Sequence, residues 1–247
     1  MPAMNLLPNG YIRAVLFDLD DTLCHHRPRA GEIFNAYVAS LGIPLNSEDV
    51  QRATRWEHYY FANSPEIRVD KQQHQNQTFE VNSFWISFSR RRLNVLGCSP
   101  AQATELAPQV AQYMIEHYHH DVFVPNDAYR LLDYLHQAGY ILGTVSNRNH
   151  PYDHHLEALG LRQYFHFTLA GGEIQSFKPE PAIFEEALRR ANTSPAETLY
   201  IGDNYFADII GARRAGLWPV LYDPDGVFPE ADCPTISSFD QLMTQLK

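Results

Sequence analysis

The sequence predicts an α/β protein: a Rossmann-like parallel sheet with an all-helical domain inserted into it. The first observation is an apolar run over residues 11–17, which suits a buried strand. The second is helical periodicity over residues 30–117, without a convincing strand. The third is an alternation of strand-like runs and short helices beyond Asp121, which indicates a parallel sheet covered on both faces. We therefore expect a discontinuous core of residues 1–29 and 118–247 around a helical domain of residues 30–117.

The composition is that of an ordinary globular protein. The chain has 247 residues, of which 45% are hydrophobic and 19% charged, so it can bury a sizeable core. Its formal net charge of −10 argues against broad nucleic-acid binding, which needs a cationic surface. No apolar run approaches the roughly 20 residues that cross a bilayer, and residues 1–8 lack the pattern of a signal peptide. We expect a cytoplasmic monomer or homodimer that binds neither membrane nor nucleic acid.

The cysteines point to the same compartment. Cys24, Cys98 and Cys233 form an odd set without CxxC spacing. This pattern fits reduced thiols better than a disulfide framework, because disulfides persist mainly in oxidising compartments. The cysteines therefore support a cytoplasmic location.

Four helices are expected in the inserted segment. The first ends at Gly42, and Asn46 offers a cap for an aromatic-rich second helix. A polar interval, residues 70–77, precedes a third helix that includes Phe79, and Ser99 with the following proline opens the fourth. Four helices with short links indicate a small bundle, and their aromatic side chains fit its interior better than a ligand site.

The predicted core elements alternate regularly. A helix that ends at Gly139 is followed by a strand (140–145), a helix (153–159), a strand (164–169), a helix (182–191), a strand (199–201), a helix around 209–215 and a last strand (218–222). Such an alternation requires each strand to lie parallel to its neighbour, with the connecting helix crossing one face of the sheet.

The first predicted strand ends in three carboxylates, Asp18, Asp20 and Asp21. Crowded, buried carboxylates are costly, so folding alone gives no reason for them, whereas a ligand crevice at the carboxyl end of a strand does. Residues two apart in an extended segment point to the same side, so Asp18 and Asp20 can converge on one point. One could attack a substrate while the other handles a proton and a divalent cation balances the charge. Taken alone, a pattern this short and common is better explained as an acidic turn after a strand.

Three further segments place polar residues beside predicted strands. Ser146 and Asn147 follow the strand predicted over residues 140–145, where a hydroxyl and backbone amides can bind a phosphate oxygen. Lys178, one of three lysines, lies in a proline-rich turn before a helix. Asp203 ends another apolar strand, and Asp208 follows at the start of a helix. Taken singly, these residues also fit a turn, a surface lysine and a favourable charge in a first helical turn.

Together these segments resemble a known family. The segment Phe17–Leu23 closely resembles the first motif of the haloacid dehalogenase superfamily of phosphohydrolases. The segments at Ser146, at Lys178 and at 202–208 (GDxxxxD) resemble its second, third and fourth motifs, in the family's order. The resemblance covers the whole predicted core, and it implies that the helical insertion is a cap between the first and second motifs.

The resemblance implies a phosphatase that depends on Mg²⁺ and hydrolyses a small phosphorylated metabolite through an aspartyl phosphate. Asp18 would be the nucleophile, and Asp20 would protonate the leaving oxygen and then activate water. The implied phosphate-binding residues are Ser146, Asn147 and the catalytic Lys178. The implied Mg²⁺ ligands are Asp18, Asp203 and the backbone carbonyl of Asp20, with Asp208 in support.

The same residues favour or disfavour each of the other activities found in the family. Dehalogenases attack carbon and lack the second aspartate of the first motif, so Asp20 favours phosphoryl chemistry. A phosphonatase needs a Schiff-base lysine in the cap, where Lys71 is the candidate and its glutamine-rich surroundings indicate solvent. A phosphomutase remains open, since it differs mainly in what receives the phosphoryl group. A non-catalytic binding or regulatory module would be favoured by loss of a motif residue, and none is lost.

Two other clusters are interpreted as having no catalytic role. Arg90, Arg91 and Arg92 form a run that fits a solvated surface better than a second anion site. His150, His154 and His155 include an i, i+4 pair, but chemistry with a hard cation does not need them. We expect these histidines to be structural or to lie on the surface.

Overall fold

The computed structural model describes residues 11–74 and 81–246, and the chain divides into two compact units. Within the described residues, the part of the chain up to residue 25 and the part from residue 123 onward form the core unit, and the part between them forms the helical unit. The chain passes between the units through β2 (His25–Arg27) and β3 (Asp121–Phe123), which pair as a two-stranded sheet. These short strands were not expected from the sequence.

The core unit is built on a six-stranded parallel sheet, which confirms the predicted fold class. The strand order is β5-β4-β1-β6-β7-β8. The bounds are Ala14–Phe17 (β1), Ile141–Ser146 (β4), Phe167–Ala170 (β5), Thr198–Gly202 (β6), Trp218–Tyr222 (β7) and Thr235–Ile236 (β8). All four residues of β1 are buried and apolar, because this strand lies inside a sheet covered on both faces.

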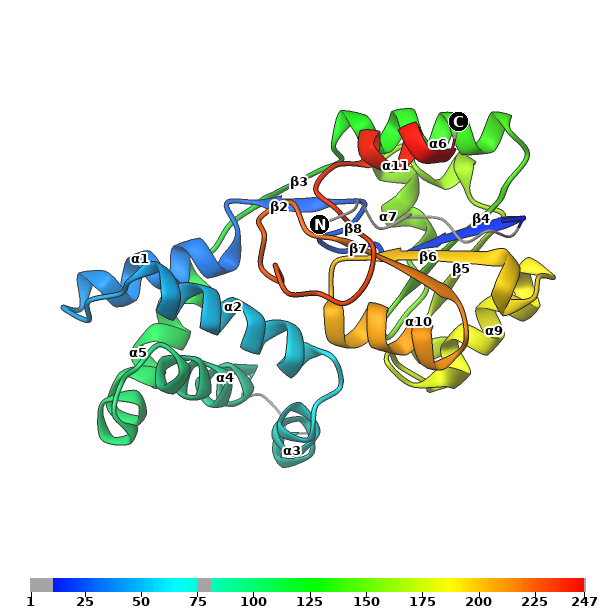
Figure 1. Cartoon of the computed structure of the whole chain (residues 1–247). Helices are drawn as coiled ribbons and strands as arrows, with labels where there is room; N and C mark the ends of the chain where they lie inside the picture. Colours follow the sequence, from blue (N-terminus) through cyan, green and yellow to red (C-terminus); the bar gives the residue numbers. More distant parts are fainter. Residues whose placement is uncertain (1–10, 75–80, 247) are drawn as a thin grey trace. The chain divides into compact units, whose positions relative to one another are not determined.

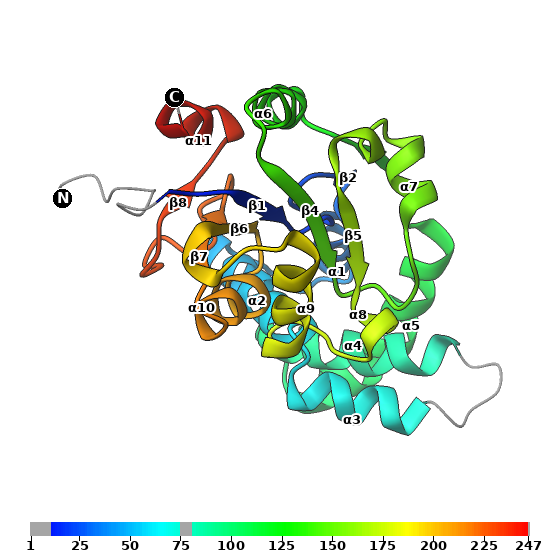
Figure 2. The same cartoon turned by 90° about the vertical axis from the view of Figure 1, so that its right-hand side faces the viewer.

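Helices cover both faces of this sheet (Figures 1 and 2). In the core unit they are α6 (Asn126–Gln137), α7 (Asp153–Ala158), α8 (Gly171–Ile174), α9 (Pro181–Ala191), α10 (Ile210–Arg214) and α11 (Phe239–Leu246). Helices α6 and α11 lie on one face, and α9 and α10 lie on the other. A π-helical turn over Tyr205–Ile209 leads into α10, and short 3-10 turns cover Arg162–Tyr164 and Pro195–Glu197. The strand β8 and the helix α11 were not predicted.

The core under α9 shows why these elements pack as they do. Ile183, Phe184 and Ala187 come from one face of α9 and are fully buried against Leu16 of β1 and Tyr200 of β6. Their i, i+1, i+4 spacing forms the apolar stripe of an amphipathic helix. This packing fixes the segment before α9, which contains Lys178, against the centre of the sheet.

The helical unit contains α1 (Ala30–Ser40), α2 (Ser47–Phe61), α3 (Pro65–His74), α4 (Val81–Val95) and α5 (Pro100–His117). Asn46 and Ser99 cap α2 and α5, accepting hydrogen bonds from the backbone N–H groups of Asp49 (2.9 Å) and Gln102 (3.3 Å). None of the helices in the described part of the chain is long and apolar enough to cross a membrane. The helices α2 and α5, capped by Asn46 and Ser99, therefore begin where the sequence predicts them.

The prediction of four helices is wrong, because the helix α3 extends into the expected polar interval and covers its residues 70–74. The Ser64 hydroxyl accepts a hydrogen bond from the N–H of Ile67 (3.2 Å), and Pro65 stands at the first helical position. Among the side chains of this helix that the structure describes, only Ile67 and Asp70 are buried, so its apolar periodicity is too sparse to be recognised. Phe79, which was expected in the next helix, lies outside the described residues.

Aromatic residues fill part of the helical unit, as expected. Tyr60 and Phe88 are buried, and Trp56 and Phe84 pack against them. Phe61 and Trp85 belong to the same aromatic group but remain 42% and 39% exposed. The aromatic residues are therefore largely structural, and two of them also present a surface.

The expected solvated arginine run is wrong for two of its three members. Arg92 has 1% of its side chain exposed, is paired with Glu57, and lies 4.1 Å from the centre of the Phe34 ring. Arg91 donates two hydrogen bonds to the buried Asp70, at 2.7 and 2.9 Å. Because α4 turns these positions inward, each needs a carboxylate to compensate its burial.

Candidate active site

The carboxyl ends of three neighbouring strands carry predicted site residues. Asp18 follows β1, Ser146 ends β4, and Asp203 follows β6. In the pairing of β1 with its two neighbours, Phe17 lies opposite Thr144 of β4 and Ile201 of β6. The N–H of Asp18 donates a hydrogen bond to the Ile201 carbonyl at 2.8 Å. Parallel strands end at the same edge of a sheet, so the topology brings these segments together at a position where α/β proteins bind ligands.

Lys178 lies at the centre of a buried ionic cluster. Its Nζ donates to Asp18 Oδ1 at 2.5 Å, to Asp208 Oδ1 at 2.7 Å and to the Tyr200 hydroxyl at 3.1 Å. Burial disfavours the ammonium form, but the two carboxylates outweigh the burial and hold the pKa of Lys178 well above its usual value. Lys178 is therefore a permanent positive charge beside Asp18.

The carboxylates still outnumber this one ammonium. Asp18, Asp203 and Asp208 each offer an oxygen, and these oxygens lie within 4.8 Å of one another. Burial, opposed by the charge of Lys178, raises the pKa of Asp18 to about 7, and burial together with Asp18 raises that of Asp203 well above its usual value. An all-oxygen set with surplus negative charge fits a hard divalent cation such as Mg²⁺.

Thr22 and Gly202 hold Asp203 and Asp208 in place. The Thr22 hydroxyl donates to Asp203 Oδ1 and accepts from the Asp203 N–H, both at 3.0 Å. A Cβ atom on Gly202 would lie 2.3 Å from the Asp208 carboxyl carbon, so a larger residue would displace Asp208. The sequence reasoning gave Thr22 no role, although its place four residues after Asp18 in the first motif was a usable signal.

Asn147 contacts Lys178, whereas the sequence indicated a phosphate contact. The N–H of Lys178 donates to Asn147 Oδ1 at 2.6 Å, and Asn147 Nδ2 donates to the Lys178 carbonyl at 2.9 Å. Both ends of the amide thus hold the backbone that presents the ammonium. Ser146, one residue earlier, is buried at the end of β4.

Asp20 has an arginine partner that the sequence reasoning missed. Arg148 Nε donates to Asp20 Oδ2 at 3.0 Å, and Nη2 donates to Oδ1 at 2.6 Å. Both side chains are about one-third exposed, at 35% for Asp20 and 31% for Arg148. A charged residue directly after Ser146 and Asn147 was the available signal, but nothing in the sequence identified its partner.

A histidine also lies near Asp20. His155, expected to be structural or on the surface, offers a ring nitrogen within 4.8 Å of Asp20 and Cys24 ligand atoms. Both Asp20 oxygens accept from Arg148, and Cys24 Sγ donates to the Leu19 carbonyl at 3.5 Å. The pKa of Cys24 is raised above its usual value, mainly by burial and also by the nearby Asp20 charge. Because the thiolate is the form that binds a metal, this thiol is a poor ligand. The all-oxygen group is the better candidate cation site.

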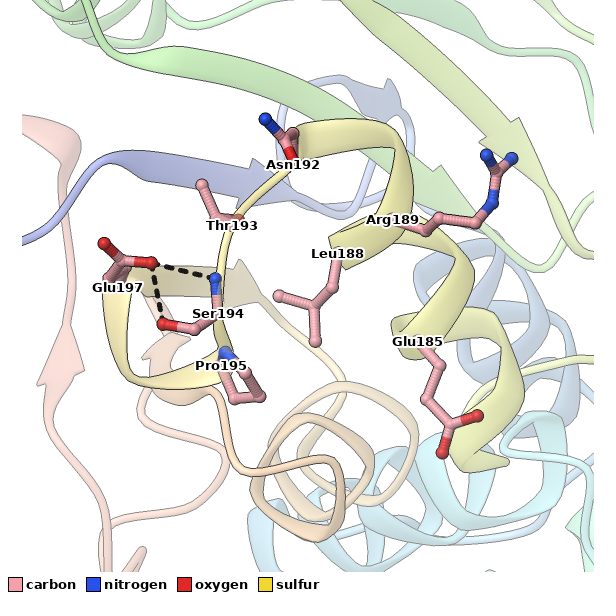
Figure 3. A pocket seen from close by; sticks show the side chains of 8 residues that line it. All are labelled: Glu185, Leu188, Arg189, Asn192, Thr193, Ser194, Pro195 and Glu197. Atoms are coloured by element: carbon pink, nitrogen blue, oxygen red, sulfur yellow. Dashed lines mark hydrogen bonds between the residues drawn. The ribbon is translucent and has the colours of Figure 1, made fainter.

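A surface hollow of about 590 Å³ lies away from these residues (Figure 3). It lies between the end of α9 and the turn that precedes β6, at the amino end of that strand. Its lining residues are Glu185, Leu188, Arg189, Asn192, Thr193, Ser194, Pro195 and Glu197. None of them is a predicted site residue, so the hollow is not the candidate active site.

The fold and site define a class: an α/β protein with acidic residues and one lysine at the carboxyl ends of its central strands. The model of haloacid dehalogenase-like hydrolases matches residues 12–216, so the chain belongs to this family of hydrolases. The family resemblance of the motifs is thereby confirmed.

Individual relatives cover most of the chain. The human haloacid dehalogenase-like hydrolase domain-containing protein 3 is 28% identical, over 91% of this chain and 86% of its own. A glyceraldehyde 3-phosphate phosphatase from Methanothermobacter thermautotrophicus is also 28% identical, over 90% of each chain. The crystal structure of a 2-haloacid dehalogenase from Pseudomonas syringae is similar with a TM-score of 0.55 and 26% identity, over 95% of this chain and 98% of that one.

Proposed function

We propose that the protein is a phosphatase that depends on Mg²⁺ and hydrolyses a small phosphorylated metabolite through an aspartyl phosphate. The observation that carries this proposal is the contact of 2.5 Å between Lys178 Nζ and Asp18 Oδ1, at the end of the central strand. The contact sets the Asp18 carboxylate beside a fixed positive charge, and this supports Asp18 as the nucleophile because attack on an anionic phosphoryl group requires such a charge. Relatives that are named phosphatases, such as the glyceraldehyde 3-phosphate phosphatase, support a phosphate ester as substrate.

In the first step, Asp18 attacks phosphorus. Its Oδ1 accepts a hydrogen bond from Lys178, which holds the carboxylate in place at the end of β1. The new bond joins Asp18 to phosphorus while the ester P–O bond breaks, and Asp20 gives its proton to the departing oxygen. In the second step, Asp20 takes a proton from water, the water attacks phosphorus, and phosphate is released. Lys178 and Ser146 hold phosphoryl oxygens in both steps, while Asn147 holds the backbone of Lys178.

The cation belongs beside Asp18 and Asp203, two of the three carboxylates whose oxygens lie within 4.8 Å of one another. Asp18, Asp203 and the backbone carbonyl of Asp20 would hold Mg²⁺, which would balance the negative charge of carboxylates and phosphate when bound. Asp208 supports the site because it fixes Lys178, and Thr22 supports it because it fixes Asp203. These contacts keep two side chains in place before substrate arrives, so less reorganisation is needed in the reaction.

We also propose that the helical unit is a cap that selects the substrate, with residues 30–117 as its functional domain. The core residues described above recognise phosphate and a cation, which all phosphate esters share. Discrimination between esters therefore has to come from other residues, and Phe61 and Trp85 give the helical unit an exposed aromatic surface.

Dehalogenation is the second candidate, because a solved dehalogenase structure is among the similar proteins. Attack on carbon with halide as leaving group needs no acid, so Asp20 would be without a role in it. A phosphomutase would use the same two aspartates with a different phosphoryl acceptor. A phosphonatase is disfavoured because Lys71, on α3, is exposed and sits among polar residues. A non-catalytic module is disfavoured because every motif residue is present.

The decisive test is a panel of phosphorylated metabolites and one aryl phosphate, assayed for phosphate release with and without Mg²⁺. We expect hydrolysis that requires Mg²⁺ and one metabolite class that is clearly preferred. Halide release from 2-haloacids is measured in parallel. Halide release without phosphate release would assign the second candidate. Mg²⁺-dependent conversion of a sugar phosphate into its isomer would assign a mutase.

A further inference from the structure

Arg148 and Asp20 form a pair joined by two hydrogen bonds, close in the chain to the proposed nucleophile Asp18. The guanidinium donates to both carboxylate oxygens, at 3.0 and 2.6 Å. Two parallel hydrogen bonds fix the plane of a carboxylate as well as its position, which a single bond does not. The pair joins residues 128 positions apart in the core unit, so it is made by the fold and not by local sequence.

Arg148 is itself held in place. Its carbonyl accepts a hydrogen bond from the N–H of Gly172 at 3.0 Å, and a Cβ atom on Gly172 would lie only 1.9 Å from the carbonyl oxygen of Asn149. Its guanidinium carbon lies 5.6 Å from the centre of the Tyr152 ring. Tyr152 is buried, and its hydroxyl oxygen lies within hydrogen-bond distance of the Thr144 hydroxyl (2.9 Å) and of the Leu169 carbonyl (3.3 Å). A fixed loop backbone and a fixed ring thus orient the guanidinium that in turn orients Asp20.

We propose that Arg148 is a positioning residue for Asp20: its two hydrogen bonds use one lone pair on each carboxylate oxygen, and they keep the remaining lone pairs, which carry the proton, directed at the leaving-group oxygen. This inference rests on the proposed role of Asp20 as acid and base. Asp20 is one-third exposed, and without a partner its side chain would sample several rotamers. Misplacement of a reacting group by about 1 Å can cost on the order of 10²-fold in rate. The effect of Arg148 therefore reaches the reaction through Asp20 alone.

The test compares kcat/KM for an alkyl phosphate with that for an aryl phosphate in Asp20→Asn, Arg148→Met, Arg148→Lys and the double variant Asp20→Asn/Arg148→Met. This parameter covers the steps up to release of the leaving group, in which an alkyl oxide needs a proton and an aryl oxide hardly does. We expect Arg148→Met to lower the alkyl value roughly 10- to 100-fold and to change the aryl value little. Arg148→Lys should recover part of the loss, since an ammonium can replace one of the two bonds.

The double variant gives the sharpest readout. If Arg148 acts through Asp20, the double variant should be no worse with the alkyl phosphate than Asp20→Asn alone. Arg130→Met is the matched control, because Arg130 makes the same two-bond contact with Asp240 (3.3 and 2.6 Å) on the core-unit surface. It should leave both kcat/KM values at wild-type level, and melting temperatures identify any variant that fails to fold.

Three results would overturn the inference. Losses that multiply in the double variant would mean that Arg148 acts independently of Asp20. A rise in KM that appears only for substrates with a second anionic group would make Arg148 a substrate-binding residue. Equal alkyl and aryl losses in Arg148→Met, with a clear difference in Asp20→Asn, would remove Arg148 from the reaction and leave the proposed function intact. If Asp20→Asn itself lowered kcat/KM equally for the alkyl and the aryl phosphate, the proposed role of Asp20 as acid and base would be wrong.

Discussion

Lys178 and Asp18 are 160 positions apart in the sequence, yet their Nζ and Oδ1 atoms lie 2.5 Å apart in the core unit. The same ammonium is 2.7 Å from Asp208 Oδ1, so one cation compensates two buried carboxylates. The contact requires the segment before α9 to pack at the end of β1. It joins the folding of the core to the chemistry proposed for it, because the same charge serves both.

The substitution Asp18→Asn should abolish turnover and leave the fold intact. An amide occupies the same volume as the carboxylate but is a poor nucleophile. Phosphate release and circular dichroism measure the two effects separately. Asp223→Asn is a suitable control, because Asp223 is a buried carboxylate of the core unit that accepts two backbone hydrogen bonds outside the site (2.8 Å each). Near-normal activity in a folded Asp18→Asn protein would contradict the mechanism.

Lys178→Met should lower both stability and activity. It leaves Asp18 and Asp208 buried without their cation, and breaking a buried ion pair typically costs about 3–5 kcal/mol. The double variant Lys178→Met/Asp208→Asn removes one of the uncompensated charges, so it should recover part of the free energy of unfolding and none of the activity. Urea denaturation and phosphate release test this pair. Recovery of activity in the double variant would show that Lys178 has only a structural role.

Mg²⁺ should raise the melting temperature, and more at about pH 8 than at about pH 5. Burial raises the pKa of Asp18 to about 7 from 3.8, so below pH 7 the Mg²⁺-free site holds a proton that the cation must displace. That proton stabilises the Mg²⁺-free folded state fully below about pH 4, and this contribution is lost as the pH rises through about 7. At a Mg²⁺ concentration of about 100 times Kd, binding adds ~2.7 kcal/mol, or a shift of roughly 5–10 °C.

Thermal scans with and without Mg²⁺ measure this shift, and Asp203→Asn is the variant that should lose it. An equal shift in Asp203→Asn would place the cation elsewhere. A larger shift at the lower pH would contradict the proposed competition between protons and Mg²⁺.

Asp20→Asn should separate the two proposed steps when an aryl phosphate is the substrate. Phosphorylation of Asp18 can proceed, because an aryl oxide leaves without an acid, but hydrolysis of the intermediate lacks its base. General acid–base help is typically worth roughly 10²–10⁴-fold, which is large enough to resolve. Rapid-quench kinetics should therefore show a burst of product, and mass spectrometry should show a phosphorylated protein. Slow turnover without a burst would assign Asp20 to the structure or to the cation site.

Substrate choice should change when the exposed aromatic residues of the helical unit are truncated. Trp85→Ala and Phe61→Ala should alter the ranking among phosphate esters, because these side chains are the large aromatic surface of a unit proposed to be the cap. Activity toward the small aryl phosphate should change less. Ile115→Ala is the matched control, since Ile115 on α5 is equally exposed, at 42%. An unchanged ranking in both aromatic variants would remove these two residues from substrate selection.

The sequence by itself determined the class of fold and the ends of the central strands. The apolar run before Asp18 and the one before Asp203 are β1 and β6, since a buried strand in a parallel sheet must be apolar on both faces. The caps at Asn46 and Ser99 were equally readable, because capping is a local hydrogen bond between near neighbours. The family resemblance followed from such local motifs, and the catalytic roles assigned to their residues remain predictions.

Only the tertiary structure decided which polar groups meet. The partners of Lys178, the contact between Arg148 and Asp20, and the burial of Arg92 all join elements that are distant in sequence. Periodicity and propensity describe neighbours along the chain, whereas these pairs depend on how strands and helices pack. The helix α3 is a second example of structure that the local sequence pattern does not predict. Its stability comes from burying Ile67 and from the hydrogen bonds that Asp70 accepts from Tyr60 and Arg91 on other helices. A sequence pattern with so few apolar positions does not reveal that packing.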